Sequence, residues 1–384
     1  MTKLFTIFLS YILIFFNTSL LGEDNSKQLK IGLLAPFSGE YKSLGNSLMF
    51  SVQLALKEIG NEKIKIIPRD SGSENKKKMD IAIKEIINEG AKIIIGPVDS
   101  VNSKQLSNYK DTIFISLSNK EPEISDNVIN IGISLESQLL ALQDFIIKKN
   151  KTKTVVMYPE NEYSNFIEEK IKKIKLKRFK TFKYNSDPKF LTGEIEKLTN
   201  YSQRKRSLEI RKKILEKKDD EKSKNELELL EQKYTLGKVN FDSVIIIDFG
   251  DSLKSTLTSL LYSDVNEKDV LFTTVNQWFD ESIFYENSIK KLFYPSVDLK
   301  NFKKYNNEYL KTFKNEPSEI SILAYDAVGL IYYIWKKNDS IKSIDNFFIK
   351  DKIKGKIGTF SFKDNKVLQE LNIYKMENKK FIKF

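Results

Sequence analysis

The stretch that decides the fold is "IGLLAPFSGEYKSLGNSLMFSVQLALKEI", residues 31–59. It begins with an apolar run that stops at Pro36, and a short polar loop with Gly39 and Gly45 follows. After the loop, apolar residues recur at the spacing of one helix face: Leu48, Val52, Ala55, Leu56 and Ile59. The pattern predicts a strand, a loop and a helix in that order, and the loop is a candidate for holding a ligand.

The same strand–helix unit recurs along the chain. Short apolar runs are typical of parallel strands that are buried on both faces. The first series predicts strands at 30–35, 63–68, 92–96 and 112–117, with helices at 46–59, 76–89 and 101–110. The second predicts strands at 153–159, 178–184, 241–248 and 269–274, with helices from residue 134, at 162–174 and at 252–263. Helices near 299–314 and 318–337 and short antiparallel strands close the chain. This order predicts an α/β fold with two doubly wound layers.

The composition excludes several kinds of chemistry. The 384 residues include no Cys and no His. Thiol nucleophiles, Ser-His-Asp triads and the usual zinc sites are therefore ruled out. The sequence also has no G-x-G-x-x-G motif and no P-loop. We expect a protein that is not an enzyme and that has no metal site and no cofactor.

The net charge of +12 admits two interpretations. One is a compositional bias toward Lys, Ile and Asn, because only five of the 64 basic residues are Arg. The other is attraction to anionic surfaces such as lipid head groups or cell-wall polymer. Nucleic acid is not an expected partner, because Arg is scarce and no basic helix has aromatic residues interleaved with it.

Residues 1–22 have the pattern of a secretory signal peptide. Lys3 precedes the 13-residue apolar run "LFTIFLSYILIFF", and the small and polar residues "NTSLLG" follow. An uncleaved anchor is the alternative, although the run is shorter than the roughly 20 residues that a comfortable membrane span needs. The expected location is periplasmic. The absence of Cys argues against a lipoprotein, whose N-terminal Cys carries the lipid.

A charged segment, residues 200–238, interrupts the alternation. Leu208 and Leu215 are one heptad apart, and Leu227, Leu230 and Tyr234 follow at helical spacing. The intervening "KKDDEKSKN" contains no apolar residue. We expect two amphipathic helices around a polar turn near 218–225. The segment is either a solvated hairpin packed on its own lobe or an arm that docks another protein.

Polar loops follow several of the expected strands, and ligands of open parallel sheets bind beyond the carboxyl ends of strands. The loops of the first series are 36–45, 96–103 and 116–123. Their hydroxyl and amide groups suit a small anion, although Ser and Asn also simply cap helices. The candidate ligand-binding residues in these loops are Ser38, Tyr41, Ser100, Ser118 and Asn119.

The second series supplies candidates of a different kind. Its loops place aromatic rings, amides and a carboxylate at strand ends, and the carboxylate is suited to the ammonium group of an amino acid. The candidates are Tyr163, Asp248, Asn276 and Trp278. Trp278 is as easily explained as a core or interface residue.

The order of these pieces resembles the type I periplasmic binding proteins of the Leu/Ile/Val-binding kind. The matching pieces are "IGLLAPFSGEYKSLGNS", "IIPRDSGSE", "EGAKIIIGPVDS", "IFISLSN", "YPENEYS", "FDSVIIIDFGDS", "ISILAYDAVGLIYYIW" and "IGTFSF". The resemblance implies two Rossmann-like lobes that are joined by a three-segment hinge and close on a small ligand. It also implies ligand roles for Ser100, Ser118 and Tyr163, and an inner-membrane ABC transporter permease as partner.

With that resemblance, the chain divides into alternating segments of two lobes. Residues 28–133 form the first part of lobe 1, and residues 134–290 form lobe 2, with the helical insertion at 200–238. Residues 291–345 return to lobe 1, and residues 346–384 add C-terminal strands to lobe 2.

A non-transport branch of the same superfamily is the alternative. Its members are envelope proteins that activate penicillin-binding proteins in peptidoglycan synthesis. The stretch from "ISLSN" to "NVINIGISLESQ" and the charged insertion before "FDSVIIIDFG" resemble that branch. In that case the partner is a penicillin-binding protein instead of a permease.

Overall fold

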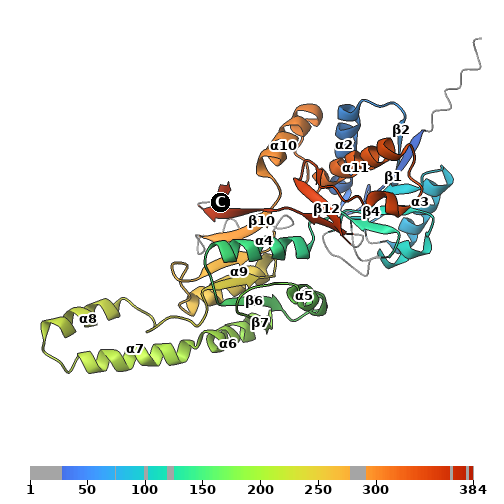
Figure 1. The fold of residues 1–384 in the computed structure, drawn as a ribbon. Helices are drawn as coiled ribbons and strands as arrows, with labels where there is room; N and C mark the ends of the chain where they lie inside the picture. The colour runs from blue at the N-terminus through green and yellow to red at the C-terminus, as the bar shows by residue number, and fades with distance from the viewer. Residues whose placement is uncertain are drawn as a thin grey trace, which may run out of the picture.

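The computed structural model describes residues 28–73, 75–98, 103–118, 125–276, 291–363, 366–377 and 380–383. The expected signal peptide lies outside these residues. The described chain forms two α/β lobes, one on an eight-stranded sheet and one on a seven-stranded sheet (Figure 1). The predicted fold class is thus confirmed. No helix in the described ranges combines the length and the hydropathy needed to cross a bilayer.

Lobe 1 contains six parallel strands among the described residues, five of which lie in the order β5-β4-β3-β1-β2. Both faces of this sheet are buried, which explains the continuous apolar runs in the sequence. Ile31 and Leu33 of β1 pack with the helices α2, α10 and α11, whereas Leu34 packs on the opposite face with α3. The elements are β1 (Leu29–Ala35), α2 (Lys42–Ile59), β2 (Ile64–Asp70), α3 (Lys76–Asn88), β3 (Ile93–Ile95), the 3₁₀ helix η1 (Ser103–Asn108), β4 (Ile113–Ser116), β5 (Val128–Asn130), α10 (Leu299–Phe313), α11 (Ser321–Asn338) and the 3₁₀ helix η3 (Ile344–Phe347).

Lobe 2 has the same design around five parallel strands in the order β10-β9-β8-β6-β7. Helices α4 and α5 cover one face, and α6 and α9 cover the other. The elements are α4 (Leu135–Lys148), β6 (Thr154–Pro159), α5 (Ser164–Ile171), β7 (Phe179–Tyr184), α6 (Pro188–Thr199), β8 (Ser243–Ile246), α9 (Gly250–Tyr262), β9 (Leu271–Thr274) and β10 (Leu292–Ser296). The antiparallel strands β14 (Asn372–Glu377) and β15 (Lys380–Lys383) extend the sheet beside β10.

The insertion forms an arm that projects from lobe 2 (Figure 1). It consists of α7 (Tyr201–Leu215) and α8 (Glu221–Glu231), which pack together through Leu208, Leu215 and Leu230. The predicted pair of helices is therefore confirmed, and the turn between them lies slightly earlier than expected. We call residues 200–238 the arm from here on.

We had expected all of the C-terminal strands, in residues 346–384, to join lobe 2, but only some of them do. Strands β11 (Ile353–Lys354), β12 (Thr359–Lys363) and β13 (Lys366–Gln369) belong to the sheet of lobe 1, where β13 pairs with β5. Only β14 and β15 belong to lobe 2. The prediction for 353–369 was wrong because an alternating apolar pattern marks a strand but does not say which sheet edge it joins. The return to lobe 1 was also placed too early, since β10 still belongs to lobe 2.

Three crossovers connect the lobes at the carboxyl ends of the sheets. They follow β5, β10 and β13, and β5 and β13 run parallel in the first sheet. Because β5 and β10 leave their sheets from the carboxyl end, the carboxyl-end loops of both sheets lie on the side of the crossovers. The topology therefore turns the loops that contain most candidate residues toward the region between the lobes.

Candidate ligand-binding site

The first loop is shaped by two glycines. Gly39 has a φ of +76°, a conformation that L side chains rarely adopt. A Cβ on Gly45 would collide with the carbonyl oxygen of Pro36. Glycine at position 45 therefore lets the first turn of α2 pack directly against the end of β1. This packing places Ser38 and Tyr41 between the carboxyl end of β1 and the N-terminus of α2.

Asp70 and Lys78 hold this loop in place. The Asp70 carboxylate accepts hydrogen bonds from the backbone N–H groups of Phe37 and Gly72, both at 2.9 Å. The Lys78 ammonium donates to Asp70 Oδ2 at 2.5 Å and to the Ser38 hydroxyl at 2.7 Å. Partial burial disfavours the charged form of Asp70, but these hydrogen bonds outweigh that effect and hold its pKa well below the ordinary range. Ser38 is thus engaged by Lys78, whereas the ring of Tyr41 is 44% exposed.

Ser118 follows β4 and is buried. Its backbone N–H donates to the hydroxyl of Ser116 at 3.3 Å, which fixes the chain as it leaves the strand. This position at the carboxyl end of a central strand is the one that the sequence predicted. The other two candidates of these loops, Ser100 and Asn119, lie outside the described residues.

Asp248 lies at the carboxyl end of β8, and protein donors surround it. The Tyr184 hydroxyl and the Ser252 hydroxyl donate to Oδ2 at 2.5 Å and 2.6 Å. The backbone N–H of Phe249 donates to Oδ1 at 2.8 Å. Burial raises the pKa of Asp248 above its ordinary value, although the hydrogen bonds from Ser252 and Tyr184 act in the opposite direction. In this structure Asp248 joins β7, β8 and α9 within lobe 2.

Two aromatic rings are exposed at the strand ends of lobe 2. Tyr163 immediately precedes α5 in the loop after β6, and its side chain is 37% exposed. Phe249 immediately precedes α9 in the loop after β8, and it is 48% exposed. With Tyr41 of lobe 1, both lobes therefore present an exposed ring from a carboxyl-end loop. Phe249 was not among our candidates, although its place directly after an apolar strand was a usable signal.

Asn276 links the end of β9 to α4 and β10 through hydrogen bonds. Its backbone N–H donates to Gln138 Oε1 of α4 at 2.7 Å, and its side-chain amide donates to Pro295 O at 3.2 Å and to Ser296 Oγ at 3.1 Å. These bonds connect the end of β9 to the start of α4 and to the end of β10, which lie beside two crossovers. Trp278 lies outside the described residues.

Buried hydrogen bonds also tie the three crossovers to one another. The Gln369 side-chain amide donates to the carbonyl oxygens of Ile131 and Gly132, both at 2.9 Å, and joins the third crossover to the first. The Tyr374 hydroxyl donates to Val297 O and accepts from Leu299 N–H, both at 2.8 Å, and joins the third to the second. The crossovers therefore form one connected hinge region.

Metal binding finds no support in the part of the chain that the structure describes. Within it, no group of three or more Asp and Glu side chains is arranged to hold a metal ion. What the site offers instead is hydroxyl groups, backbone N–H groups and aromatic rings, which suit a small organic molecule.

The fold and the loops define a two-lobe α/β protein, and comparisons with known proteins show which proteins it resembles. Residues 28–175 match a family model described as "Periplasmic binding protein". No curated protein matches the sequence. The resemblance that the sequence indicated is thus confirmed.

Solved structures of this fold extend the match to nearly the whole chain. A putative branched-chain amino acid ABC transporter protein from Rhodospirillum rubrum has a TM-score of 0.67 and 11% identity, and covers 93% of this chain and 99% of its own. The branched-chain amino acid substrate-binding protein LivJ from Streptococcus pneumoniae, in complex with isoleucine, has a TM-score of 0.58, 17% identity, and coverage of 92% and 98%. A solute-binding protein from R. palustris, in complex with 4-hydroxybenzoate, has a TM-score of 0.60, 14% identity, and coverage of 93% and 95%. The TM-scores and the coverage show a shared fold, and at identities this low the likeness shows the fold alone.

Proposed function

We propose that this protein is a periplasmic solute-binding protein that captures a small molecule between its lobes for an ABC-type transporter, without catalysing a reaction. The observation that carries the proposal is the arrangement of the two parallel sheets, whose carboxyl-end loops lie on the side of the crossovers. Exposed rings on both lobes, Tyr41 on one and Tyr163 and Phe249 on the other, support an organic ligand.

The ligand class that we propose is an amino acid or a related small carboxylate. Backbone N–H groups and hydroxyls at strand ends and helix N-termini favour a carboxylate. The structural relatives bound to isoleucine and to 4-hydroxybenzoate are consistent with such a ligand. The partner that we propose is the permease of the transporter, which would receive the ligand from the closed protein.

A thermal-shift screen with free amino acids, their amides and aromatic acids tests the proposal. A true ligand stabilises the folded protein by about 2.7 kcal/mol at 100-fold excess over its Kd. The absence of any shift, together with capture of a penicillin-binding protein by the purified chain, would favour the envelope-regulator alternative and contradict this one.

A single substitution locates the ligand within the site. Ser118→Ala should weaken binding of the ligand found in the screen by roughly fivefold, because a neutral hydrogen bond is worth about 1 kcal/mol. The matched control is Ser107→Ala, an exposed serine of the 3₁₀ helix η1 in the same lobe whose hydroxyl bonds only locally to Lys104 O. Equal affinity of wild type and Ser118→Ala in calorimetry would mean that the ligand does not use this loop.

A further inference from the structure

The arm has a charge distribution that its own packing does not explain. Residues 201–218 contain eight Lys and Arg against two Glu, whereas residues 219–232 contain six Asp and Glu against two Lys. The first set is α7 and the turn after it, and the second set contains α8. The arm is therefore polarised across its width, with a basic helix beside an acidic one.

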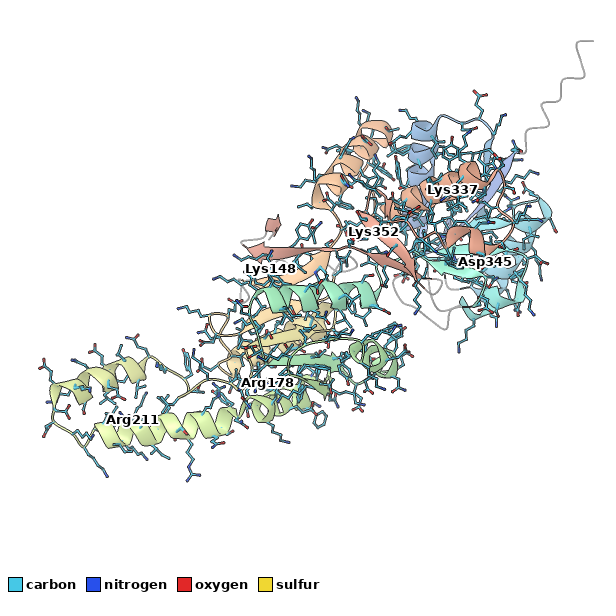
Figure 2. The ribbon with its side chains drawn as sticks, in the orientation of Figure 1. Lys148, Arg178, Arg211, Lys337, Asp345 and Lys352 are labelled. Carbon is cyan, nitrogen blue, oxygen red and sulfur yellow. The ribbon has the colours of Figure 1, made fainter. Side chains whose placement is uncertain are left out.

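The bonds that hold the arm together use only the inner sides of its helices. Leu208 and Leu215 of α7 pack against Leu230 of α8. Arg211 forms a two-bond ion pair with Glu226, with both bonds at 2.8 Å. Figure 2 labels Arg211 on the arm, far from the labelled Lys337 and Asp345 of lobe 1. The outer side of α7 is left to solvent.

That outer side combines cations with exposed isoleucines. At 3.6 residues per turn, Arg206, Ile210, Lys213 and Ile214 lie on one face, opposite Leu208 and Leu215. Ile210 is 49% exposed and Ile214 is 44% exposed. Lys217 follows in the turn just past the helix, and the acids Glu209 and Glu216 border this face. Among the described residues, the structure records no ion pair of Arg206, Lys213 or Lys217.

We propose that this outer face of α7 binds an anionic lipid surface. The cations would pair with phosphate groups, and the two isoleucines would enter the boundary between head groups and acyl chains. An acidic protein is the less favoured partner, because the face has no aromatic anchor of the kind that dominates protein interfaces. Long flexible side chains around two aliphatic ones fit a fluid surface whose charges can move.

The acidic helix α8 sets the orientation of this contact. Packed helices lie about 8–10 Å apart, and the screening length at physiological salt is about 8 Å. Charges on the far side of α8 therefore weaken the attraction of the α7 face only in part. An anionic surface attracts α7 and repels α8, so only one side of the arm can lie against it. This inference does not depend on the ligand that the lobes capture.

Co-sedimentation with lipid vesicles tests the proposal. We expect the full chain to bind vesicles that contain roughly 30 mol% phosphatidylglycerol, to bind pure phosphatidylcholine far less, and to lose binding as salt rises. The triple variant Arg206→Gln, Lys213→Gln and Lys217→Gln should lower the partition coefficient by roughly 100-fold, since each basic residue near such a surface strengthens partitioning by roughly fivefold. Ile210→Ser with Ile214→Ser should weaken binding without changing its salt dependence.

The matched control keeps the net charge of the triple variant but changes the other side of the arm. Lys222→Gln, Lys224→Gln and Lys233→Gln should retain the wild-type partition coefficient. All substituted side chains are exposed, and an unchanged melting temperature verifies that each variant is folded. Equal binding of wild type to charged and neutral vesicles would overturn the proposal. Equal losses in the two triple variants, or binding to polyglutamate but not to vesicles, would also overturn it.

Discussion

Asp70 holds the first loop in place from outside that loop. It receives two backbone N–H groups and the Lys78 ammonium, and it thereby links the ends of β1 and β2 to α3. The sequence placed Ser38 in the loop correctly but gave no sign of its bond to Lys78, which lies 40 positions away. Long-range pairings of this kind leave no local pattern, so the partners of a candidate residue were beyond prediction.

Asp70→Asn should lower the free energy of unfolding by about 1–3 kcal/mol at neutral pH, because it removes the charge that these donors stabilise. The folded-state pKa of Asp70 is depressed, so its contribution is present above the unfolded value of about 3.9 and is lost as the pH falls through the folded value. Urea unfolding should therefore show a smaller gap between wild type and variant at pH 3 than at pH 7, because part of the contribution of Asp70 has been lost at pH 3. An equal gap at both would contradict this role.

Asp326 should give the opposite pH dependence. Its carboxylate in α11 accepts the N–H groups of Lys356 at 2.8 Å and Ile357 at 2.9 Å, and burial raises its pKa to about 6. The folded state therefore binds more protons than the unfolded state between about pH 4 and 6, and the free energy of unfolding falls as the pH rises through this window. We expect a fall on the order of 1–3 kcal/mol. Denaturant titrations of wild type and Asp326→Asn should differ in this slope, whereas the exposed control Asp126→Asn should keep it.

At the scale of elements, periodicity predicted most of the structure. The leucines of the arm predicted both of its helices, and the continuous apolar runs predicted the central strands of both sheets. The elements that were missed include β5, α6, β10 and the 3₁₀ helix η3. Strands β5 and β10 are short, and β10 contains Pro295, which masks its apolar character. The helix expected at 101–110 is a 3₁₀ helix at Ser103–Asn108.

Arg204 fixes the base of the arm. Its guanidinium is buried and donates to Thr199 O at 3.0 Å, to Thr235 Oγ1 at 2.9 Å and to Ser263 O at 2.5 Å. Arg204→Ala leaves these buried acceptors without a donor, so we expect the free energy of opening of the arm to fall by about 2 kcal/mol. Hydrogen exchange of the α7 amides measures this effect. The exposed control Arg206→Ala should leave exchange unchanged, and similar exchange in both variants would argue against an anchoring role.

At the scale of the whole molecule, the connected crossovers unite two lobes that each have their own core. Gln369 and Tyr374 bond neighbouring crossovers to one another, so a rotation of one lobe must involve all three. The sequence indicated two lobes and a hinge only through resemblance to a family. Composition and periodicity alone predicted the layers but not which strands cross between them, and for this reason residues 353–369 were assigned to the wrong lobe.

The proposed function requires that a small ligand closes the two lobes around the hinge. Small-angle X-ray scattering of the purified chain, with and without a saturating concentration of a ligand from the thermal-shift screen, measures this closure directly. A ligand that binds the closed form more tightly shifts the population toward it. We predict a smaller radius of gyration with saturating ligand, and a smaller decrease in Ser118→Ala than in wild type when the ligand concentration is near the wild-type Kd. An unchanged radius of gyration with demonstrably bound ligand would contradict closure of the lobes on the ligand.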